Sequence, residues 1–261
     1  MLSSQSGEIP DYELVWTSIY TFQCRRMAQF RKGRTFFAGD SAHQVSPFGA
    51  RGANSGMQDA ENLAWKLDFV TKGHAPETLL SSYEHERGYA ADENILNSSR
   101  STDFMTPKSN AAMTFRNAVL ELARDHAFAR PLVNSGRLSV PSVSDSFPMI
   151  GVDQLANGPK VTRPGAPCTD APLKQGYLLD KLGHDFVLLA IGGDAPPALL
   201  IDGVSVRVLH AAPPSEELAS RYLGDNPQAF YLVRPDQHIV ARWGALDTEN
   251  VRAALRTALG K

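Results

Sequence analysis

Residues 33–67 contain the residue types whose spacing could do chemistry, in the string GRTFFAGDSAHQVSPFGARGANSGMQDAENLAWKL. A short apolar run ends at Gly39-Asp40, and a loop with a proline and two glycines leads from there into a helical period. Glycines let a backbone pass close to a flat ligand, and the start of a helix presents unpaired N–H groups and a positive dipole end. An aspartate at the end of a strand accepts hydrogen bonds from hydroxyl groups. The segment therefore predicts a site for a flat, hydroxyl-bearing ligand with partial negative charge.

This geometry alone is typical of many α/β proteins. The glycine spacing from Gly49 is G-x-x-G-x-x-x-G, which differs from the G-x-G-x-x-G dinucleotide pattern, and the chain has no Walker A pattern. Two further polar residues lie in the loop. His43 is expected to make structural hydrogen bonds, whereas Arg51 is equally compatible with a contact to a negative charge and with a plain surface position.

The longer string AGDSAHQVSPFGARGANSGMQDAENLAWKL resembles the second flavin-binding motif of the FAD-dependent aromatic hydroxylases, single-component flavoprotein monooxygenases related to phenol and 3-(3-hydroxyphenyl)propionate hydroxylases. The resemblance implies that Asp40 binds the ribityl chain of FAD and that the loop runs along the isoalloxazine ring. It also implies that the backbone amides of Ala53 and Asn54, at the start of the helix, point to the pyrimidine edge, where the helix dipole stabilises the negative charge of reduced flavin. The implied cofactor-binding residues are Gly39, Asp40, Pro47, Gly49, Gly52, Ala53 and Asn54.

The activity implied by this resemblance is hydroxylation of a small aromatic substrate with FAD, NAD(P)H and O2. The cofactor carries the oxygen chemistry and the protein supplies position and electrostatics, so the sequence marks no catalytic acid or base. One alternative is a non-catalytic remnant or assembly module without flavin turnover. Another is a small α/β binding protein unrelated to flavin.

Hydrophobic periodicity predicts the elements that position this segment. Aromatic and β-branched residues between 12 and 30 suggest strands, followed by a turn at residues 31–34 and a strand at residues 35–38. Apolar residues at helical spacing then predict a helix up to Gly73, with Asn54 or Ser55 as its N-cap and an apolar face that runs from Met57 to Val70. Further helices are expected over residues 77–97 and 110–128.

Proline marks the predicted boundary between two folded parts, because seven of the 17 prolines fall between Pro131 and Pro172. The predicted fold class is α/β with α+β elements. Residues 1–140 would form the C-terminal part of an FAD-binding monooxygenase domain, residues 141–164 a Pro-rich linker, and residues 165–261 a domain similar to the thioredoxin-like domain appended in the family. Its strands are expected at residues 186–191, 198–201, 205–209, 229–233 and 238–243, with helices after Ser215 and Asp247.

The first flavin-binding unit of the family, which carries G-x-G-x-x-G, has no counterpart here. A separate N-terminal half is therefore an expected partner, and the chain alone should hold flavin weakly or not at all. The family also suggests a homodimer.

Composition excludes other classes of function. The 261 residues contain 26 Lys+Arg and 28 Asp+Glu without a basic arm, so no nucleic-acid partner is expected. The longest strongly apolar run, residues 186–191, is far too short to span a membrane, and residues 1–5 show no signal-peptide pattern, so a cytoplasmic location is expected. Cys24 and Cys168 are too isolated to indicate a disulfide framework or a metal site.

Overall fold

The computed structural model of the chain describes residues 12–143, 146–211 and 214–261. Two parts of the sequence-based predictions lie outside these residues: the start of the chain, for which no signal-peptide pattern is expected, and positions 144–145 of the predicted linker.

The segment before the glycine-rich loop forms only short ladders. Residues 12–24 have no regular secondary structure, and β1 (Arg25–Arg26) pairs with β4 (His43–Gln44). The hairpin of β2 (Arg31–Lys32) and β3 (Thr35–Phe36) confirms the predicted turn, which Gly33 makes with φ +60°. The longer strands expected over residues 12–30 are therefore wrong, because extended chain without neighbouring strands cannot complete a ladder.

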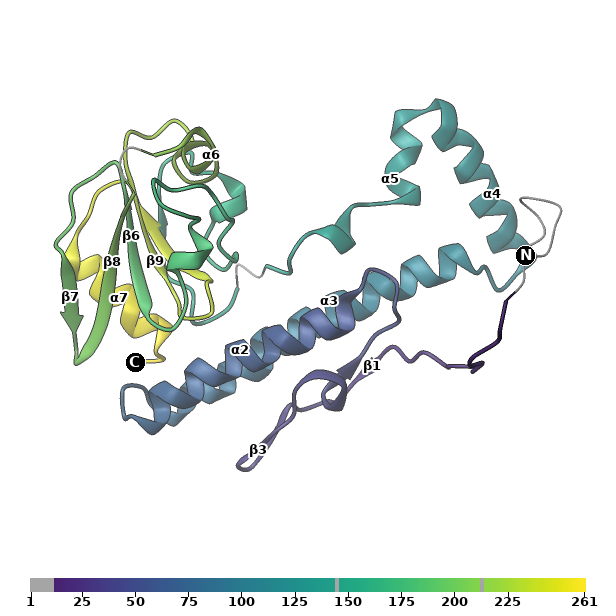
Figure 1. Ribbon diagram of the computed structural model, residues 1–261, viewed down its shortest axis with the longest axis horizontal. Helices are drawn as coiled ribbons and strands as arrows, with labels where there is room; N and C mark the ends of the chain where they lie inside the picture. Colours follow the sequence, from purple (N-terminus) through teal and green to yellow (C-terminus); the bar gives the residue numbers. More distant parts are fainter. Residues whose placement is uncertain (1–11, 144–145, 212–213) are drawn as a thin grey trace.

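Two long helices run side by side across the molecule: α2 (Arg51–Thr71) and α3 (Ser81–Met105) (Figure 1). The left-handed Gly73 ends the first of these, as the sequence predicts. The second extends well past Asn97, where the sequence predicts its end. A third helix, α4 (Asn110–Asp125), follows at the predicted place with Ser109 as its N-cap, and the short α5 (Arg130–Val133) folds back on it.

A six-stranded sheet forms the C-terminal part, in the order β5-β10-β9-β6-β8-β7. Its strands are β5 (Asp153–Gln154), β6 (Phe186–Ile191), β7 (Ala198–Ile201), β8 (Val204–Ala211), β9 (Ala229–Val233) and β10 (Ile239–Trp243). The β6–β8 and β10–β5 pairs are parallel and the others antiparallel. All six residues of β6 are buried, as expected for a central strand covered on both faces.

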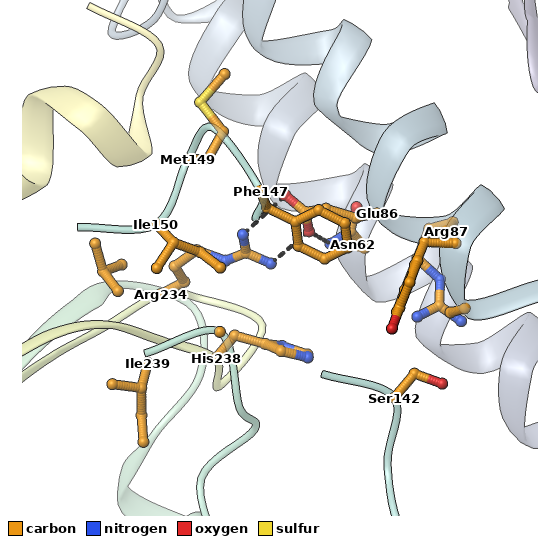
Figure 2. Close-up of a pocket in the computed structure, with 14 residues that line it drawn as sticks. Asn62, Glu86, Arg87, Ser142, Phe147, Met149, Ile150, Arg234, His238 and Ile239 are labelled. Carbon is orange, nitrogen blue, oxygen red and sulfur yellow. Dashed lines mark hydrogen bonds and ion pairs between the residues drawn. The ribbon is translucent and has the colours of Figure 1, made fainter. Parts of the chain in front are cut away.

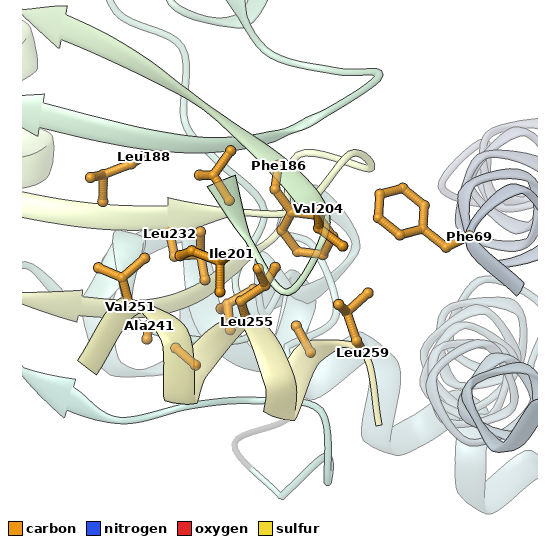
Figure 3. Close-up of a cluster of buried hydrophobic side chains, with 14 of the residues drawn as sticks. Phe69, Phe186, Leu188, Ile201, Val204, Leu232, Ala241, Val251, Leu255 and Leu259 are labelled. Atoms are coloured by element: carbon orange, nitrogen blue, oxygen red, sulfur yellow. The ribbon is translucent and has the colours of Figure 1, made fainter. Parts of the chain in front are cut away.

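Helices cover both faces of this sheet. The helix α7 (Thr248–Ala258), capped by Asp247 as predicted, packs on one face, and α6 (Glu216–Leu218) lies against the other. The core beneath α7 continues into α2, because the Phe69 ring lies 5.5 Å from the Phe186 ring, centroid to centroid (Figure 3). One hydrophobic core therefore joins the long helices to the sheet.

The predicted class of mixed helices and sheets is confirmed, whereas the domain boundaries and the thioredoxin-like assignment stay predictions. Within the segment predicted as a linker, β5 adds to the sheet and the Gly151 amide donates to the Val240 carbonyl at 2.9 Å. Part of that connection is thus built into the sheet. Among the described residues, no helix is both long and apolar enough to cross a membrane, and no group of three or more His, Cys, Asp or Glu side chains is placed to hold a metal ion.

Candidate functional site

Gly39 and Asp40 lie against the first turns of α2. They form a tight turn, Gly39–Ser41, directly after the β2–β3 hairpin, and Gly39 adopts a left-handed φ of +58°. A Cβ atom built on Gly56 of α2 would come within 3.3 Å of the Gly39 Cα atom. Because two glycines meet here, the turn sits close to the helix backbone.

The Asp40 side chain is exposed at this turn. It lines a groove of about 240 Å³, together with Arg25, Arg26, Met27, Ser41, Ala42, His43 and Gln44. The groove therefore offers a carboxylate, an excellent hydrogen-bond acceptor for hydroxyl groups, next to the backbone of β1 and β4.

The start of α2 differs from the prediction. The Ala50 amide donates to the Pro47 carbonyl at 3.0 Å, and Ala50 is the N-cap with a left-handed φ of 51° and no side-chain cap. The Asn54 side chain donates back to the Ala50 carbonyl at 2.7 Å, while the Ser55 hydroxyl accepts from Arg87 at 3.1 Å. The predicted caps are therefore wrong, since both side chains have other partners and the helix begins earlier.

The earlier start of α2 determines which of its backbone amides have no acceptor within the helix. Helix geometry gives the Gly52 and Ala53 amides no intrahelical acceptor, whereas the amide of Asn54 lies opposite the Ala50 carbonyl. Of the two amides that the resemblance implies, Ala53 thus presents a backbone donor at the positive end of the helix dipole and Asn54 does not, while Gly52, which was not expected to do so, presents a second donor.

Gly49 and Gly52 differ in whether the fold requires glycine at their positions. Gly49 has φ +87°, which favours glycine. A Cβ atom on Gly52 would meet only the Val45 Cγ2 atom at 3.7 Å, an ordinary van der Waals contact. The fold therefore does not require glycine at position 52.

Arg51 is neither a plain surface residue nor an exposed anion contact. Its guanidinium donates to the Arg137 carbonyl at 3.1 Å and to the Val140 carbonyl at 2.8 Å. It thereby ties the chain after α5 to the start of α2.

A buried carboxylate that sequence reasoning missed lies behind the loop. Asp59 of α2 is fully buried and contacts His43 Nε2 at 2.5 Å, Arg87 Nε at 2.6 Å and the Gly39 amide at 2.9 Å. Burial would raise the pKa of Asp59, but the hydrogen bond with His43 and the charge of Arg87 outweigh it, so the pKa is lowered. His43 makes the structural hydrogen bond expected of it.

The buried face of α2 is not the apolar face that periodicity predicts. Met57 is 66% exposed, whereas Ser55, Asp59, Asn62 and Lys66 are buried. Periodicity misses such a face because each buried polar group has a partner on another element, which the local sequence does not reveal.

A second buried ionic network joins α2 and α3 to the turn between β9 and β10. Glu86 accepts from Arg234 at 2.8 and 3.0 Å (Figure 2). Glu86 also lies 3.1 Å from the Lys66 ammonium, and Asp236 accepts from Arg234 at 2.6 and 2.8 Å. Asn62 donates to both carboxylates. Burial lowers the pKa of Lys66 to about 8, whereas the charges of Arg234 and Lys66 overcome burial and lower the pKa of Glu86 to about 2.

Two cavities lie away from the predicted site. The pocket in Figure 2, bounded by Glu86, Phe147, Arg234 and His238, has a volume of about 30 Å³, the room of about one water molecule. A wider cleft of about 760 Å³ lies between α2 and the loops of the sheet, and none of the predicted flavin residues lines it.

Comparison with known proteins gives one family match and several long alignments. Residues 2–98 match the family model of the FAD binding domain. The 6-methylpretetramide 4-monooxygenase of Streptomyces rimosus is 31% identical, over 94% of this chain and 48% of that protein. The 3-(3-hydroxy-phenyl)propionate/3-hydroxycinnamic acid hydroxylase of Comamonas testosteroni is 45% identical over 102 residues, which are 39% of this chain and 17% of that protein.

A solved structure agrees with these relatives. The rebeccamycin biosynthetic enzyme RebC with reduced flavin matches with a TM-score of 0.65 and 25% identity, over 91% of this chain and 47% of RebC. The predicted cofactor, FAD, is confirmed by the family match and by this flavin-bound neighbour. The chain spans about half the length of the curated relatives that it matches over most of its own length.

Proposed function

Because the chain is an FAD-dependent aromatic hydroxylase-like protein that spans about half the length of its relatives, we propose that its residues 39–54 bind the ribityl chain and pyrimidine edge of FAD. In this proposal it is the C-terminal portion of an FAD-dependent monooxygenase. The reaction is hydroxylation of a small aromatic compound with NAD(P)H and O2.

The proposal is carried by an exposed acceptor on the Gly39–Ser41 turn, which lies against α2, and by uncapped donors at the start of that helix. Asp40 offers a carboxylate to the ribityl hydroxyls, and the Gly52 and Ala53 amides offer donors to the carbonyl and ring nitrogen of the pyrimidine edge. The residues present therefore fit this part of FAD.

Bound FAD supplies the redox and oxygen chemistry of such a reaction. The chain's own contribution is to orient the ring through Pro47 and Gly49 and to stabilise negative charge at the pyrimidine edge through the helix dipole. Among the described residues, the acids and bases that the proposed site holds are Asp40 and the buried His43–Asp59 pair. The aromatic substrate is thus oriented chiefly by parts of the enzyme outside residues 39–54.

A partner polypeptide completes the proposed site. The groove at Asp40, about 240 Å³, is below the roughly 300–1,000 Å³ typical of small-molecule pockets. Residues 12–22 expose large apolar side chains, among them Trp16 at 80% and Ile19 at 99% exposed. Unpaired extended chain of this kind can accept strands from another polypeptide. We assign that role to the N-terminal half of the enzyme.

The same apolar segment favours a second candidate function, a non-catalytic assembly module. Flavin binding distinguishes the two candidate functions, because an assembly module needs no cofactor. A homodimer and a cytoplasmic location belong to the proposal as well: the family likeness supports the homodimer, and the free thiols of Cys24 and Cys168 fit a reducing compartment. Sedimentation of the purified chain tests the homodimer.

Titration with FAD, followed by its visible difference spectrum, tests the proposed function. The chain is measured alone and with an added polypeptide that carries the G-x-G-x-x-G half of a relative. We expect weak binding alone, at least tenfold tighter binding with the added half, and a loss of about tenfold or more in Asp40→Ala, since hydrogen bonds to a charged group are removed. The exposed Asp125→Ala is the matched control. Absence of FAD binding both by the chain alone and by the chain with the added half would favour the assembly module.

A further inference from the structure

Asp59 connects the flavin loop to the interior of the protein. Its Oδ2 atom accepts from the Gly39 amide at 2.9 Å and contacts His43 Nε2 at 2.5 Å, while its Oδ1 atom accepts from Arg87 Nε at 2.6 Å. Four elements therefore meet at one carboxylate: α2, α3, β4 and the turn at Gly39.

The bond to Gly39 fixes the peptide unit immediately before Asp40. Gly39 is in the left-handed region, and its Cα atom is packed against Gly56. With the amide held from one side and the Cα atom from the other, the turn has one orientation in which it can present Asp40. Asp59 thus sets the direction of the Asp40 side chain without contacting it.

Arg87 and His43 make this arrangement rigid. Arg87 also donates to the Ser55 hydroxyl at 3.1 Å and to Gln58 Oε1 at 3.2 Å, so its guanidinium has little freedom. His43 is 2% exposed and lies beside the Phe30 ring. A buried carboxylate with its partners in place is costly to move, because any displacement leaves a charge unpaired.

We propose that Asp59 is a positioning residue for flavin: through the Gly39 amide it aims Asp40 at the ribityl hydroxyls and so sets the preference of the site for flavins that carry a ribityl chain. This inference rests on the proposed function. It predicts that Asp59 acts on ribityl recognition without contacting the flavin.

Paired titrations with riboflavin and with lumiflavin, which lacks the ribityl chain, test the proposal on the full chain together with the added polypeptide that carries the G-x-G-x-x-G half. The fluorescence of each flavin reports binding, and the ratio of the two dissociation constants measures ribityl recognition. The variants are Asp40→Ala, Asp59→Asn and the double variant. Asp68→Asn, which removes an exposed carboxyl of α2 that pairs with Lys72, is the matched control.

We expect the wild type and Asp68→Asn to bind riboflavin at least tenfold more tightly than lumiflavin. Asp40→Ala should abolish this preference and Asp59→Asn should reduce it at least fivefold with lumiflavin affinity retained. The double variant should lose no more than Asp40→Ala, since both residues act through one contact. A merely structural role of Asp59 would weaken both flavins equally.

Other outcomes separate the two hypotheses. If the wild type lacks the ribityl preference, the proposed function fails and the inference with it. If Asp40→Ala loses the preference and Asp59→Asn keeps it, only the inference is overturned.

Hydrogen exchange of the wild-type Gly39 amide gives a test that needs no stable variant. An amide held by a buried carboxylate exchanges slowly, at least 100-fold below the rate of an unprotected loop amide. Exchange at the unprotected rate would overturn the role assigned to Asp59, even if Asp59→Asn failed to fold.

Discussion

At the scale of a single residue, position 52 distinguishes a glycine that the fold requires from a glycine that a bound ligand would require. Its backbone conformation suits any residue, and a Cβ atom there meets only Val45 at an ordinary distance. A requirement for glycine at this position would therefore come from outside the chain, from the face of a bound ring.

Gly52→Ala should leave the chain as stable as the wild type, or more stable by up to about 1 kcal/mol, because alanine is the better helix former. The same change should weaken FAD binding several-fold, since the methyl group occupies the space proposed for the ring. Thermal unfolding and FAD titration measure the two effects.

Gly88→Ala provides the matched control in α3, because a Cβ atom there has no neighbour within 4 Å. It should stabilise the chain similarly with FAD affinity unchanged. Equal FAD affinity in Gly52→Ala and wild type would remove the close-approach argument for Gly52.

At the scale of elements, a buried ionic network holds the long helices against the turn between β9 and β10. Arg234, on that turn, is bonded to Glu86 of α3 and to Asp236. Because the pKa of the buried Glu86 is lowered in the folded chain, the network makes the stability of the chain depend on pH.

Glu86→Gln should reduce the acid sensitivity of the chain. The pKa of Glu86 falls from 4.5 to about 2 on folding, so the unfolded state binds a proton more readily between these values. The stabilisation, about 3 kcal/mol, is complete above about pH 5 and is lost as the pH falls toward 2.

Urea unfolding at pH 6, 4 and 3 measures this dependence. The wild type should lose stability more steeply than Glu86→Gln, although the variant starts lower at pH 6. The exposed Glu121→Gln should follow the wild type. Parallel curves for wild type and Glu86→Gln would contradict the pKa assigned to Glu86.

Apolar packing joins the same elements. Phe69 of α2 is 8% exposed and meets Trp65 and Phe186 edge to face. Phe69→Ala should therefore lower the free energy of unfolding by about 3 kcal/mol. Phe115→Ala, on α4 and 62% exposed, should change it by less than about 0.5 kcal/mol. Equal losses of unfolding free energy in the two variants would show that the buried Phe69 contact adds nothing to stability beyond what an exposed phenylalanine contributes.

At the scale of the whole molecule, the shared core and the ionic network predict that α2, α3 and the sheet unfold together. Amides of α2 and of β6 should exchange with the same global free energy, measured by hydrogen exchange in increasing denaturant. Two separate values, with the sheet persisting after the helices have opened, would contradict a single cooperative unit.

Local patterns were sufficient for five of the six strands of the sheet, for the end of α2 and for the starts of α4, α6 and α7, but not for β5, the start of α2 or the end of α3. The apolar run of β6 and the Asp247 cap of α7 can be predicted from the residues of those elements alone. The loop with Gly39, Asp40 and Gly52 was also found, because glycine and aspartate spacing is local.

What the sequence did not reveal depends on distant partners. Asp59, Lys66 and Glu86 look like solvated helix charges until α3 and the β9–β10 turn bring Arg87 and Arg234 to them. The strands expected between residues 12 and 30 fail for the complementary reason, since the described chain gives that segment few partners.

Backbone amide chemical shifts during titration with FAD test the central claim most directly. If residues 39–54 bind the ribityl chain and pyrimidine edge, the largest shifts should fall on Gly39, Asp40, Gly52 and Ala53. They should saturate together with the visible difference spectrum. Shifts concentrated in the wider cleft around Trp65 and His184, or none at saturating FAD, would contradict the claim that this loop is the flavin site.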